Sequence, residues 1–266
     1  MNFYTRLLSS ALKGGHLHRS DRILIIGGGE HDRRTMVELD IENVLITNLA
    51  HHAGQSEYAP YAWQREDAEA LSFRDQHFDR VIEHAALHHL GSPHRGLLEM
   101  LRVAQNGIIA FEARDNALMR LAVRPGLTSD YELAPAFLSR GIGMGFRDTP
   151  IPNYVTSWTE VEVRKVVYGA YPAHEHGFNF FYGLSVPVQR FRMARSPALR
   201  LAGLLLHVLE SLLRLLLGKQ GNSFGFMVLK NSRLQPWLRL DKDGAPAPGV
   251  SFLASRYDKS EYVRQR

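Results

Sequence analysis

The chain has 266 residues, 45% of them hydrophobic, and its sequence contains no cysteine. A chain of this length can bury one large core, and α/β folds of this size commonly form a single domain. The lack of cysteine excludes disulfide bonds, thiolate zinc sites and cysteine nucleophiles. It disfavours a secreted, disulfide-bonded fold and fits a reducing compartment such as the cytoplasm.

The formal net charge of +5 and the isoelectric point near 9.5 favour contact with nucleic acid, anionic lipid or an acidic substrate. The sequence has no long Lys/Arg block, no zinc-finger pattern and no recognisable RNA-binding signature. We therefore do not expect nucleic acid as a partner.

The first segments predict a helix, a buried strand and a glycine-rich turn. Residues 1–13 are amphipathic but lack the unbroken apolar stretch of a signal peptide, so we expect an ordinary first helix. Residues 22–26 form an apolar run that breaks into Gly27, Gly28 and Gly29, before a helix that reaches about residue 39. Glycine lets the main chain approach a ligand closely, so this turn is a candidate nucleotide-binding turn.

Strand and helix segments then alternate along the chain. We expect strands over residues 44–48, 61–65, 78–82 and 108–112, and a helix from Ser92-Pro93 to about 106–107. This alternation predicts an α/β fold with a doubly wound, mostly parallel sheet. The strand over 78–82 ends in polar Glu83 and His84, and the carboxyl edge of such a sheet is where ligands bind.

The second half of the chain departs from simple alternation. Residues 115–157 form an insertion rich in Arg, Gly and Pro, which we expect to be a lid or a substrate-binding region. Two strands, 176–184 and 222–230, are expected to close the sheet as an antiparallel pair. Residues 231–266 form a turn-rich peripheral tail, which leaves residues 1–230 as one domain with its core at 21–112.

Between the two closing strands we expect one long amphipathic helix, over residues 197–217. Arg200, His207, Glu210 and Arg214 share a narrow stripe and leave a broad apolar surface. These charges interrupt the apolar run too often for a membrane-spanning helix. The surface fits packing within the chain or in a homodimer, or contact through residues 199–217 with a membrane surface or a lipid-linked substrate.

The central motifs resemble those of the type-11 class I S-adenosylmethionine (SAM) methyltransferases, which include ubiquinone and menaquinone methyltransferase-like proteins. The family pattern runs from an aspartate-alanine pair through a Phe-Asp strand to Leu-His-His-Leu. Here these elements are Asp67-Ala68, Phe78-Asp79 and residues 87–90, and the resemblance covers about residues 21–112. It implies SAM as the cofactor and a Rossmann-like sheet of seven strands with an antiparallel closing strand.

The resemblance also implies the cofactor-binding residues, which are Gly27, Gly28, Gly29, Asn48, Asp67, Ala68 and Glu83. The glycines correspond to the loop beneath the methionine part of SAM, and Asp67 with Ala68 to the pair that contacts adenine. Asn48 stands where a carboxylate usually accepts hydrogen bonds from both ribose hydroxyls, and its amide oxygen is a weaker acceptor. In the alternative interpretation, Asn48 only ends a strand and Asp67 only caps a helix.

Two positions depart from the family pattern. Ile25 stands in the first strand where the family usually has an acidic residue, and His31 stands where it has a further glycine. Glu30 or Asp32 is the candidate replacement for the acid that receives the amino group of the cofactor.

Methyl transfer requires alignment of a nucleophile with the methyl group and, for an alcohol acceptor, removal of its proton. His84 and His88 are the catalytic candidates because histidine titrates near neutral pH, and Glu83 is a further base or orienting carboxylate. A structural role is the alternative for each histidine, and His89 is expected to cap or pack. We expect no metal site, because the His-x-His pairs lack cysteines or an obvious carboxylate partner.

The sequence therefore predicts a SAM-dependent methyltransferase that acts by O-methylation on a glycan, a lipid-linked sugar or another small metabolite. We expect it in the cytoplasm or peripheral to the inner face of the membrane. The alternative, left open by Ile25, His31 and Asn48, is a methyltransferase-like binding or scaffold protein without turnover. An NAD(P)-dependent oxidoreductase shares the glycine turn but leaves Asp67-Ala68 and the closing strand pair unexplained.

Overall fold

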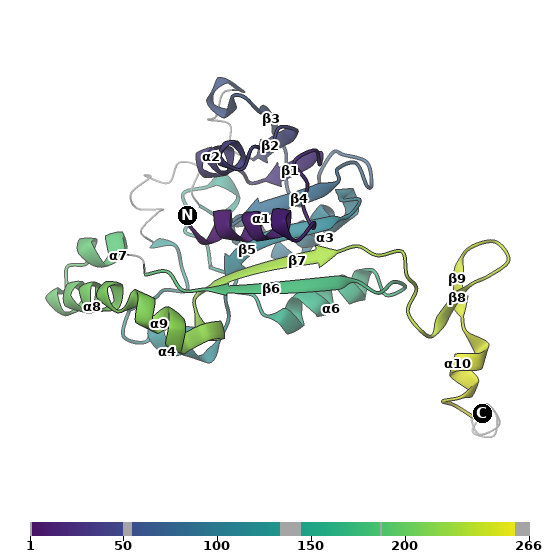
Figure 1. Ribbon diagram of the computed structural model, residues 1–266. Coiled ribbons are helices and arrows are strands. Elements are labelled where there is room, and N and C mark those ends of the chain that lie inside the picture. Colours follow the sequence, from purple (N-terminus) through teal and green to yellow (C-terminus); the bar gives the residue numbers. More distant parts are fainter. Residues whose placement is uncertain (1, 50–54, 134–144, 187, 259–266) are drawn as a thin grey trace.

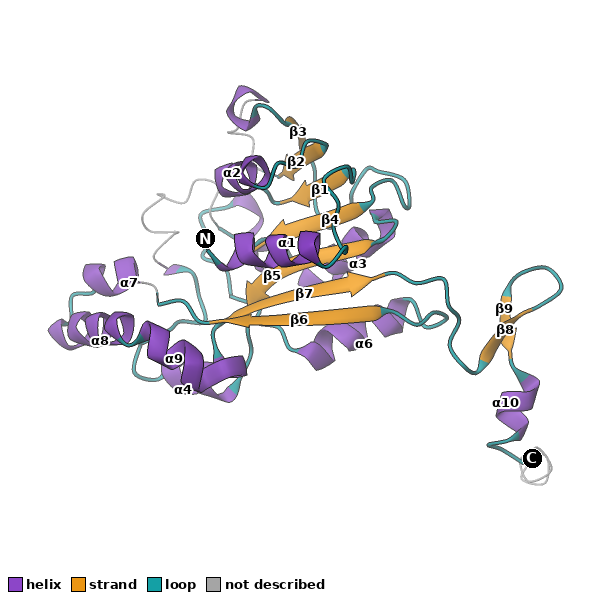
Figure 2. Ribbon diagram, viewed as in Figure 1, coloured by secondary structure: helices purple, strands orange, loops and turns teal. Residues whose placement is uncertain are grey.

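A seven-stranded sheet forms the centre of the computed structural model, which describes residues 2–49, 55–133, 145–186 and 188–258 (Figures 1 and 2). The strand order is β3-β2-β1-β4-β5-β7-β6. The strands are β1 (Ile23–Ile26), β2 (Val44–Asn48), β3 (Ala62–Arg65), β4 (Arg80–His84), β5 (Gly107–Ala113), β6 (Gly177–Gly183) and β7 (Ser223–Leu229). The pairs from β3 to β5 are parallel, and β7 runs antiparallel to both β5 and β6. The expected doubly wound sheet with an antiparallel closing strand is confirmed.

Two apolar layers cover the two faces of the sheet. Successive side chains of a strand point to opposite faces, so Ile23 and Ile25 pack on one side and Leu24 and Ile26 on the other. Helices α1 (Phe3–Lys13) and α2 (Glu30–Glu38) cover the first face, while α3 (Pro93–Val103) and α6 (Glu160–Ala170) cover the second. Burial on both faces explains why the strands are continuous apolar runs.

The helix starts follow the capping signals in the sequence. The Ser92 hydroxyl accepts a hydrogen bond from the Arg95 N–H at the start of α3, and Pro93 follows it. At the start of α6, the Thr159 hydroxyl accepts from the Glu162 N–H. The first helix, α1, is present as expected, with Asn2 as its cap.

Four helices gather at one end of the sheet (Figure 1): α4 (Ala117–Val123), α7 (Val188–Met193), α8 (Pro197–Val208) and α9 (Glu210–Leu217). The expectation of one long helix over 197–217 was wrong, because the segment forms α8 and α9. Leu209 between them has a ψ of −1°, far from the α-helical value, and this residue turns the chain. No helix within the described residues has the length and apolarity needed to cross a membrane.

The remaining elements are short. Single turns of 3₁₀ helix are η1 (Gln55–Tyr58), η2 (Leu87–His89), η3 (Phe146–Asp148) and η4 (Gly218–Gln220). The chain leaves β7 at the edge opposite to the carboxyl ends of the parallel strands. It continues into a hairpin of β8 (Leu238–Leu240) and β9 (Pro246–Pro248) and a short helix, α10 (Val250–Ala254), which project away from the sheet (Figure 1).

Candidate functional site

A cavity of about 310 Å³, here called the cofactor cavity, opens at the carboxyl edge of β1, β2 and β4. Loops that follow the parallel strands form most of its wall, and η3 of the insertion closes one side. Its lining consists of Gly27, Gly29, Asp32, Asn48, Leu49, Glu66, Asp67, Ala68, Ala85, Ala86, His89, Leu90, Gly145, Arg147 and Asp148. The structure thus brings five of the cofactor-binding candidates to one cavity, namely Gly27, Gly29, Asn48, Asp67 and Ala68.

The turn after β1 has no room for a side chain at Gly27 or Gly28, whereas Gly29 faces the cavity. Gly27 has a φ of +59°, and a Cβ atom there would lie 2.5 Å from the Cβ of Ala86. Gly28 does not line the cavity, because it is packed over Ile25 and Ile46, where a Cβ would lie 2.8 and 2.7 Å from their methyl carbons. A Cβ at Gly29 would meet no atom within 4 Å, so no side chain covers the main chain of Gly29 where a Cβ would lie.

The two departures from the family pattern leave the cavity open. Ile25 is fully buried in the core beneath the glycine turn, and the exposed His31 faces α1, where its Nε2 lies 3.1 Å from the amide nitrogen of Asn2. Of the two candidate replacement acids, Glu30 points to solvent and forms ion pairs with Arg33 and Arg34, each at 2.6 Å.

The other candidate acid, Asp32, lines the cofactor cavity. It is 4% exposed, and one carboxylate oxygen accepts a hydrogen bond of 2.9 Å from the Gly29 N–H, which caps α2. Burial raises the pKa of Asp32 above the ordinary value for aspartate, although the Gly29 hydrogen bond opposes this effect.

Asn48 and Asp67 are both held by neighbouring groups. The amide nitrogen of Asn48 donates to the Gly28 carbonyl at 3.0 Å and so ties the end of β2 to the glycine turn. Asp67 accepts from the Glu69 N–H at 2.9 Å and pairs with the guanidinium of Arg147 at 3.0 Å. Arg147 also contacts Glu69 at 2.6 Å, so η3 is joined to the loop after β3 at the Asp67 side of the cavity.

Glu83 does not line the cavity, although we expected it to be a cofactor-binding residue. It is fully buried, and its carboxylate accepts hydrogen bonds from the N–H groups of Ala86 (3.0 Å) and Phe111 (2.8 Å). These bonds support Ala85, which has a left-handed φ of +53° and forms part of the cavity wall. Burial and the nearby Glu112 raise the pKa of Glu83 well above its usual range.

His84 also lies outside the cavity lining. Its ring stacks on Tyr4 of α1 with 4.3 Å between the ring centroids, and it lies near Phe111 and His31. Burial lowers the pKa of His84 to about 4. A neutral imidazole in an aromatic stack fits the structural alternative for this residue.

His88 belongs to a buried group of charged side chains. Its Nδ1 lies 2.8 Å from a carboxylate oxygen of Glu112 at the end of β5, and its Nε2 lies 3.5 Å from Glu132 of the insertion. Burial disfavours the imidazolium, but the two carboxylates prevail and raise the pKa of His88 to about 10. The other oxygen of Glu112 accepts from the Leu87 N–H at 2.8 Å, which fixes this carboxylate in place.

His89 lies at the cavity wall, where we had expected only a capping or packing role. Its Nε2 lies 3.5 Å from Glu132, and its Nδ1 lies 2.6 Å from the amide nitrogen of Asn153. Burial and the adjacent His88 lower its pKa. His88, His89 and Glu132 could hold a metal ion, because one ligand atom from each lies within 4.8 Å of the others.

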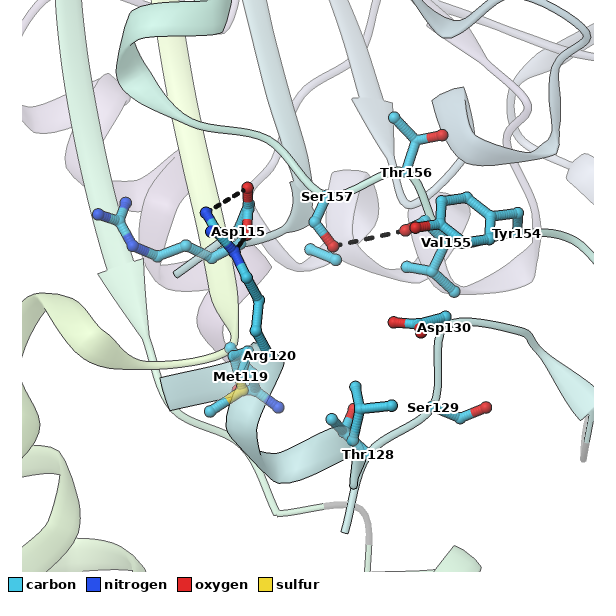
Figure 3. Close-up of a pocket in the computed structure, with 14 residues that line it drawn as sticks. Asp115, Met119, Arg120, Thr128, Ser129, Asp130, Tyr154, Val155, Thr156 and Ser157 are labelled. Carbon is cyan, nitrogen blue, oxygen red and sulfur yellow. Dashed lines mark hydrogen bonds and ion pairs between the residues drawn. The ribbon is translucent and has the colours of Figure 1, made fainter. Parts of the chain in front are cut away.

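A second cavity, here called the polar cavity, lies between the end of β5, α4 and residues 154–157 (Figure 3). Its volume is about 320 Å³. Arg120 contacts both carboxylate oxygens of Asp115, at 2.7 and 3.0 Å, on one side of it. The other polar groups of its wall include Thr128, Ser129, Asp130, Tyr154 and Ser157.

A short two-stranded ribbon connects the polar cavity with the histidines. The Val155 N–H donates to the Asp130 carbonyl at 2.8 Å, and the Glu132 N–H donates to the Asn153 carbonyl at 3.0 Å. Asp130 at one end of the ribbon lines the polar cavity, while Glu132 and Asn153 reach His88 and His89.

Comparisons with known proteins bear on the family and the fold of this chain. Residues 28–111 match the family model for a methyltransferase domain. The chain is similar to the solved structure of YcgJ from Bacillus subtilis, with 12% identity, a TM-score of 0.50, and coverage of 87% of this chain and 100% of that one. It is also similar to a methyltransferase-like protein from Bacillus halodurans, with 13% identity, a TM-score of 0.50, and coverage of 85% and 99%. No curated protein matches the sequence.

The strand directions distinguish the methyltransferase fold from that of an NAD(P)-dependent oxidoreductase. Because β7 runs antiparallel between β5 and β6, the sheet is not the all-parallel sheet of the dinucleotide-binding oxidoreductases. The matched residues contain the glycine turn after Gly27, Asp67-Ala68 and η2, which are the motifs on which the resemblance depends. Residues 28–111 thus match a methyltransferase domain, and the strand order of the sheet is that of the class I methyltransferases, whose cofactor is SAM.

Proposed function

We propose that SAM binds in the cofactor cavity and that this protein transfers its methyl group to a hydroxyl oxygen of a polar acceptor. The observation that supports this most strongly is that Gly27, Gly29, Asn48, Asp67 and Ala68, which lie far apart in the sequence, line one cavity. Its volume of about 310 Å³ falls in the range of small-molecule sites.

The chemistry of the wall suggests how SAM lies in this cavity. The bare main chain at Gly29 allows close approach of the methionine part, and the buried Asp32 carboxylate suits its ammonium group. Asn48 lies where the ribose is expected. Asp67 retains acceptor capacity for the exocyclic amine of adenine, because a carboxylate can accept more bonds than the two it makes here.

The reaction is a direct displacement. The acceptor oxygen forms a bond to the methyl carbon, the bond between this carbon and sulfur breaks with its electron pair left on sulfur, and the hydroxyl proton is released. Among the catalytic candidates, we assign His88, together with His89, Glu112 and Glu132, to the acceptor side of the cofactor. Glu83 and His84 we assign to support of the cavity wall and of the α1 contact.

The polar cavity is our candidate for the acceptor site. Hydroxyl, carboxylate and guanidinium groups beside the ring of Tyr154 suit a ligand with many hydroxyls, such as a sugar. The ribbon through Asp130 and Glu132 brings this cavity next to the histidines, which adjoin the cofactor.

Helices α8 and α9 lie next to this acceptor site and present apolar side chains to solvent. Leu201, Leu204, Leu205, Val208, Leu209, Leu212, Leu215 and Leu216 are between 43% and 81% exposed. Residues 188–220 contain six Lys or Arg residues against one acidic residue, Glu210, a net charge of +5. The Asn116 side chain donates to the Gly221 carbonyl at 2.9 Å and so joins the start of α4, which lines the polar cavity, to the chain after α9.

We propose that α8 and α9 rest on an anionic membrane surface and that the acceptor is a lipid-linked sugar. Apolar side chains among basic residues are the pattern of helices that lie in the membrane interface. This arrangement would place the sugar in the polar cavity and its lipid beneath α8 and α9, at the cytoplasmic face of the membrane.

Methyl transfer can be tested with SAM that carries a radiolabelled methyl group, incubated with purified protein and cell fractions. We expect label in the fraction extracted by organic solvent, and loss of most label with Asp67→Ala but not with Asp243→Ala, an exposed aspartate of the tail. Label in protein or nucleic acid alone would contradict the proposed acceptor, and no transfer to any fraction would contradict the proposed reaction.

Membrane contact can be tested by sedimentation with lipid vesicles. We expect the protein to bind vesicles with anionic lipid better than neutral vesicles, and a double variant, Leu215→Asp with Leu216→Asp, to bind neither. Leu240→Asp is the matched control, because Leu240 of the tail is also an exposed leucine. A homodimer that the double variant disrupts, without any vesicle binding by the wild type, would overturn this proposal.

A further inference from the structure

Three side chains beside the cofactor cavity, of which His89 lines it, have the composition of a metal site. The Nε2 atoms of His88 and His89 each lie 3.5 Å from the same carboxylate oxygen, Oε2 of Glu132. One ligand atom from each of the three residues lies within 4.8 Å of the others. Two of these residues are adjacent in η2 and the third comes from the insertion, so only the fold brings them together.

The His88 Nε2 atom is buried and makes one long contact among the described residues. The His88 side chain is 5% exposed, and its Nε2 lies 3.5 Å from Glu132 Oε2, at ion-pair distance but without a hydrogen bond of normal geometry. Buried polar atoms usually have a closer partner, so this position suits an added ligand. This atom faces Glu132 and His89, which is where an ion would lie.

The surroundings of His88 are those of a metal ligand. Its Nδ1 lies 2.8 Å from Glu112, and a carboxylate at that position holds the proton on Nδ1 and leaves the lone pair of Nε2 for a metal. Glu112 is itself fixed by the Leu87 N–H.

The Nε2 atom of His89 faces the same carboxylate oxygen. Its Nδ1 lies 2.6 Å from the side-chain amide nitrogen of Asn153, which also donates to Glu132 Oε2 at 3.2 Å. Asn153 therefore holds the His89 ring and the Glu132 carboxylate beside each other.

We propose that His88 Nε2, His89 Nε2 and Glu132 Oε2 bind a divalent transition metal ion of the zinc type. Ligand atoms about 2.1 Å from a tetrahedral zinc ion lie about 3.4 Å apart, and the two distances to Glu132 are 3.5 Å. Two imidazoles favour a transition metal over calcium or magnesium, which prefer oxygen ligands. No cysteine-containing ligand motif marks this site in the sequence. Its carboxylate, Glu132, comes from the insertion, which has no recognisable periodicity.

With three protein ligands, one position of the ion stays open, as in catalytic rather than structural zinc sites. His89 lines the cofactor cavity, so this position lies beside the cofactor. Building on the function proposed above, we infer that the acceptor hydroxyl binds there. A hydroxyl bound to such an ion releases its proton to water more readily, and its oxygen then attacks the methyl carbon as described.

The test uses the full chain, freed of metal with a chelator and titrated with Co²⁺, whose visible absorption reports tetrahedral coordination. We expect one Co²⁺ per chain, displaced by Zn²⁺. His88→Gln and Glu132→Gln should abolish the absorption, and Glu112→Gln should weaken binding about 10- to 100-fold. The matched controls are His94→Gln and Glu162→Gln, which break a surface His–Glu pair at 2.8 Å and should leave Co²⁺ binding unchanged.

The wild-type titration decides the outcome even where a variant fails to fold. Absence of Co²⁺ and Zn²⁺ binding to the wild type would overturn the metal site and leave His88 as an ion-pair partner of the two glutamates. SAM binding to the metal-free protein, measured by calorimetry, separates this result from the cofactor proposal. SAM that binds without any metal site overturns only the inference made here, whereas a metal-binding protein that does not bind SAM overturns the proposed function.

Discussion

The charge on a single buried residue, Asp32, is expected to set the affinity for SAM. Asp32→Asn keeps an oxygen that can cap α2 through the Gly29 N–H but removes the negative charge. A hydrogen bond to a charged group contributes roughly 1.5–3 kcal/mol, so we expect calorimetry to show SAM affinity lower by about ten- to a hundredfold. The control Glu30→Gln, which changes an exposed carboxylate of the same helix, should leave the affinity unchanged.

The same residue predicts a pH dependence. Because burial raises the pKa of Asp32, its carboxylate becomes protonated at a higher pH than that of an ordinary aspartate. The protonated form does not attract an ammonium group. SAM affinity should therefore fall as the pH is lowered through this raised pKa, and the fall should be absent in Asp32→Asn. A variant with the wild-type pH profile would show that another group receives the ammonium.

The backbone at Gly27 leads to a prediction about stability. Gly27→Ala places a Cβ 2.5 Å from that of Ala86 in a left-handed conformation, so we expect a loss of roughly 1–3 kcal/mol in the free energy of unfolding. Gly169→Ala is the control, because Gly169 lies in α6 and a Cβ there meets no atom within 4 Å. This control should stabilise the protein by up to about 1 kcal/mol. Urea denaturation measures both, and equal effects would contradict the packing described for the glycine turn.

At the scale of elements, η3 and the loop after β3 are joined by one side chain. Arg147 bridges Asp67 and Glu69 across the cofactor cavity, and its side chain is 42% exposed. Because an exposed ion pair contributes at most about 1 kcal/mol, Arg147→Gln should weaken SAM binding by up to about fivefold, mainly through faster dissociation. Stopped-flow measurements check this, with Arg233→Gln as the control, since Arg233 pairs with Glu175 near the tail. A slower dissociation in Arg147→Gln would mean that Arg147 competes with the cofactor for Asp67.

The strands and early helices were predictable because each is a local pattern. An apolar run bounded by glycine or polar residues defines β1, β2 and β4 to within one or two residues, and Ser92-Pro93 marks the start of α3. The break between α8 and α9 was not predictable in this way. Leu209 is an ordinary helix former, and neither glycine nor proline marks the turn there.

The histidine group was only partly predictable. His88 follows from its motif, and the acid at the end of a strand was a usable signal for Glu112. The orientation of η2, which turns His89 rather than His88 toward the cavity, depends on tertiary packing. Glu132 and Asn153 come from the insertion, which carries no periodic pattern, so only the folded chain connects them to His88 and His89.

At the scale of the whole molecule, the candidate sites lie at one edge of the sheet, where the parallel strands have their carboxyl ends. The two cavities, one of them lined by His89, lie toward this edge. Figure 1 shows α8 and α9 at the same end of the sheet and the tail leaving from the opposite end. Such a distribution is expected for an open α/β sheet, in which ligands bind beyond the carboxyl ends of the strands. Under the proposed function, this arrangement would let the donor, the acceptor and the membrane surface meet without rearrangement of the core.

The most direct test of this account is calorimetric titration of the purified protein with SAM, and separately with NAD⁺ and NADP⁺. We predict that one SAM binds per chain, that neither dinucleotide binds, and that Asp67→Ala weakens SAM binding while Asp243→Ala does not. A wild-type protein that is folded but takes up no SAM, or that prefers a dinucleotide, would contradict the assignment of the cofactor cavity.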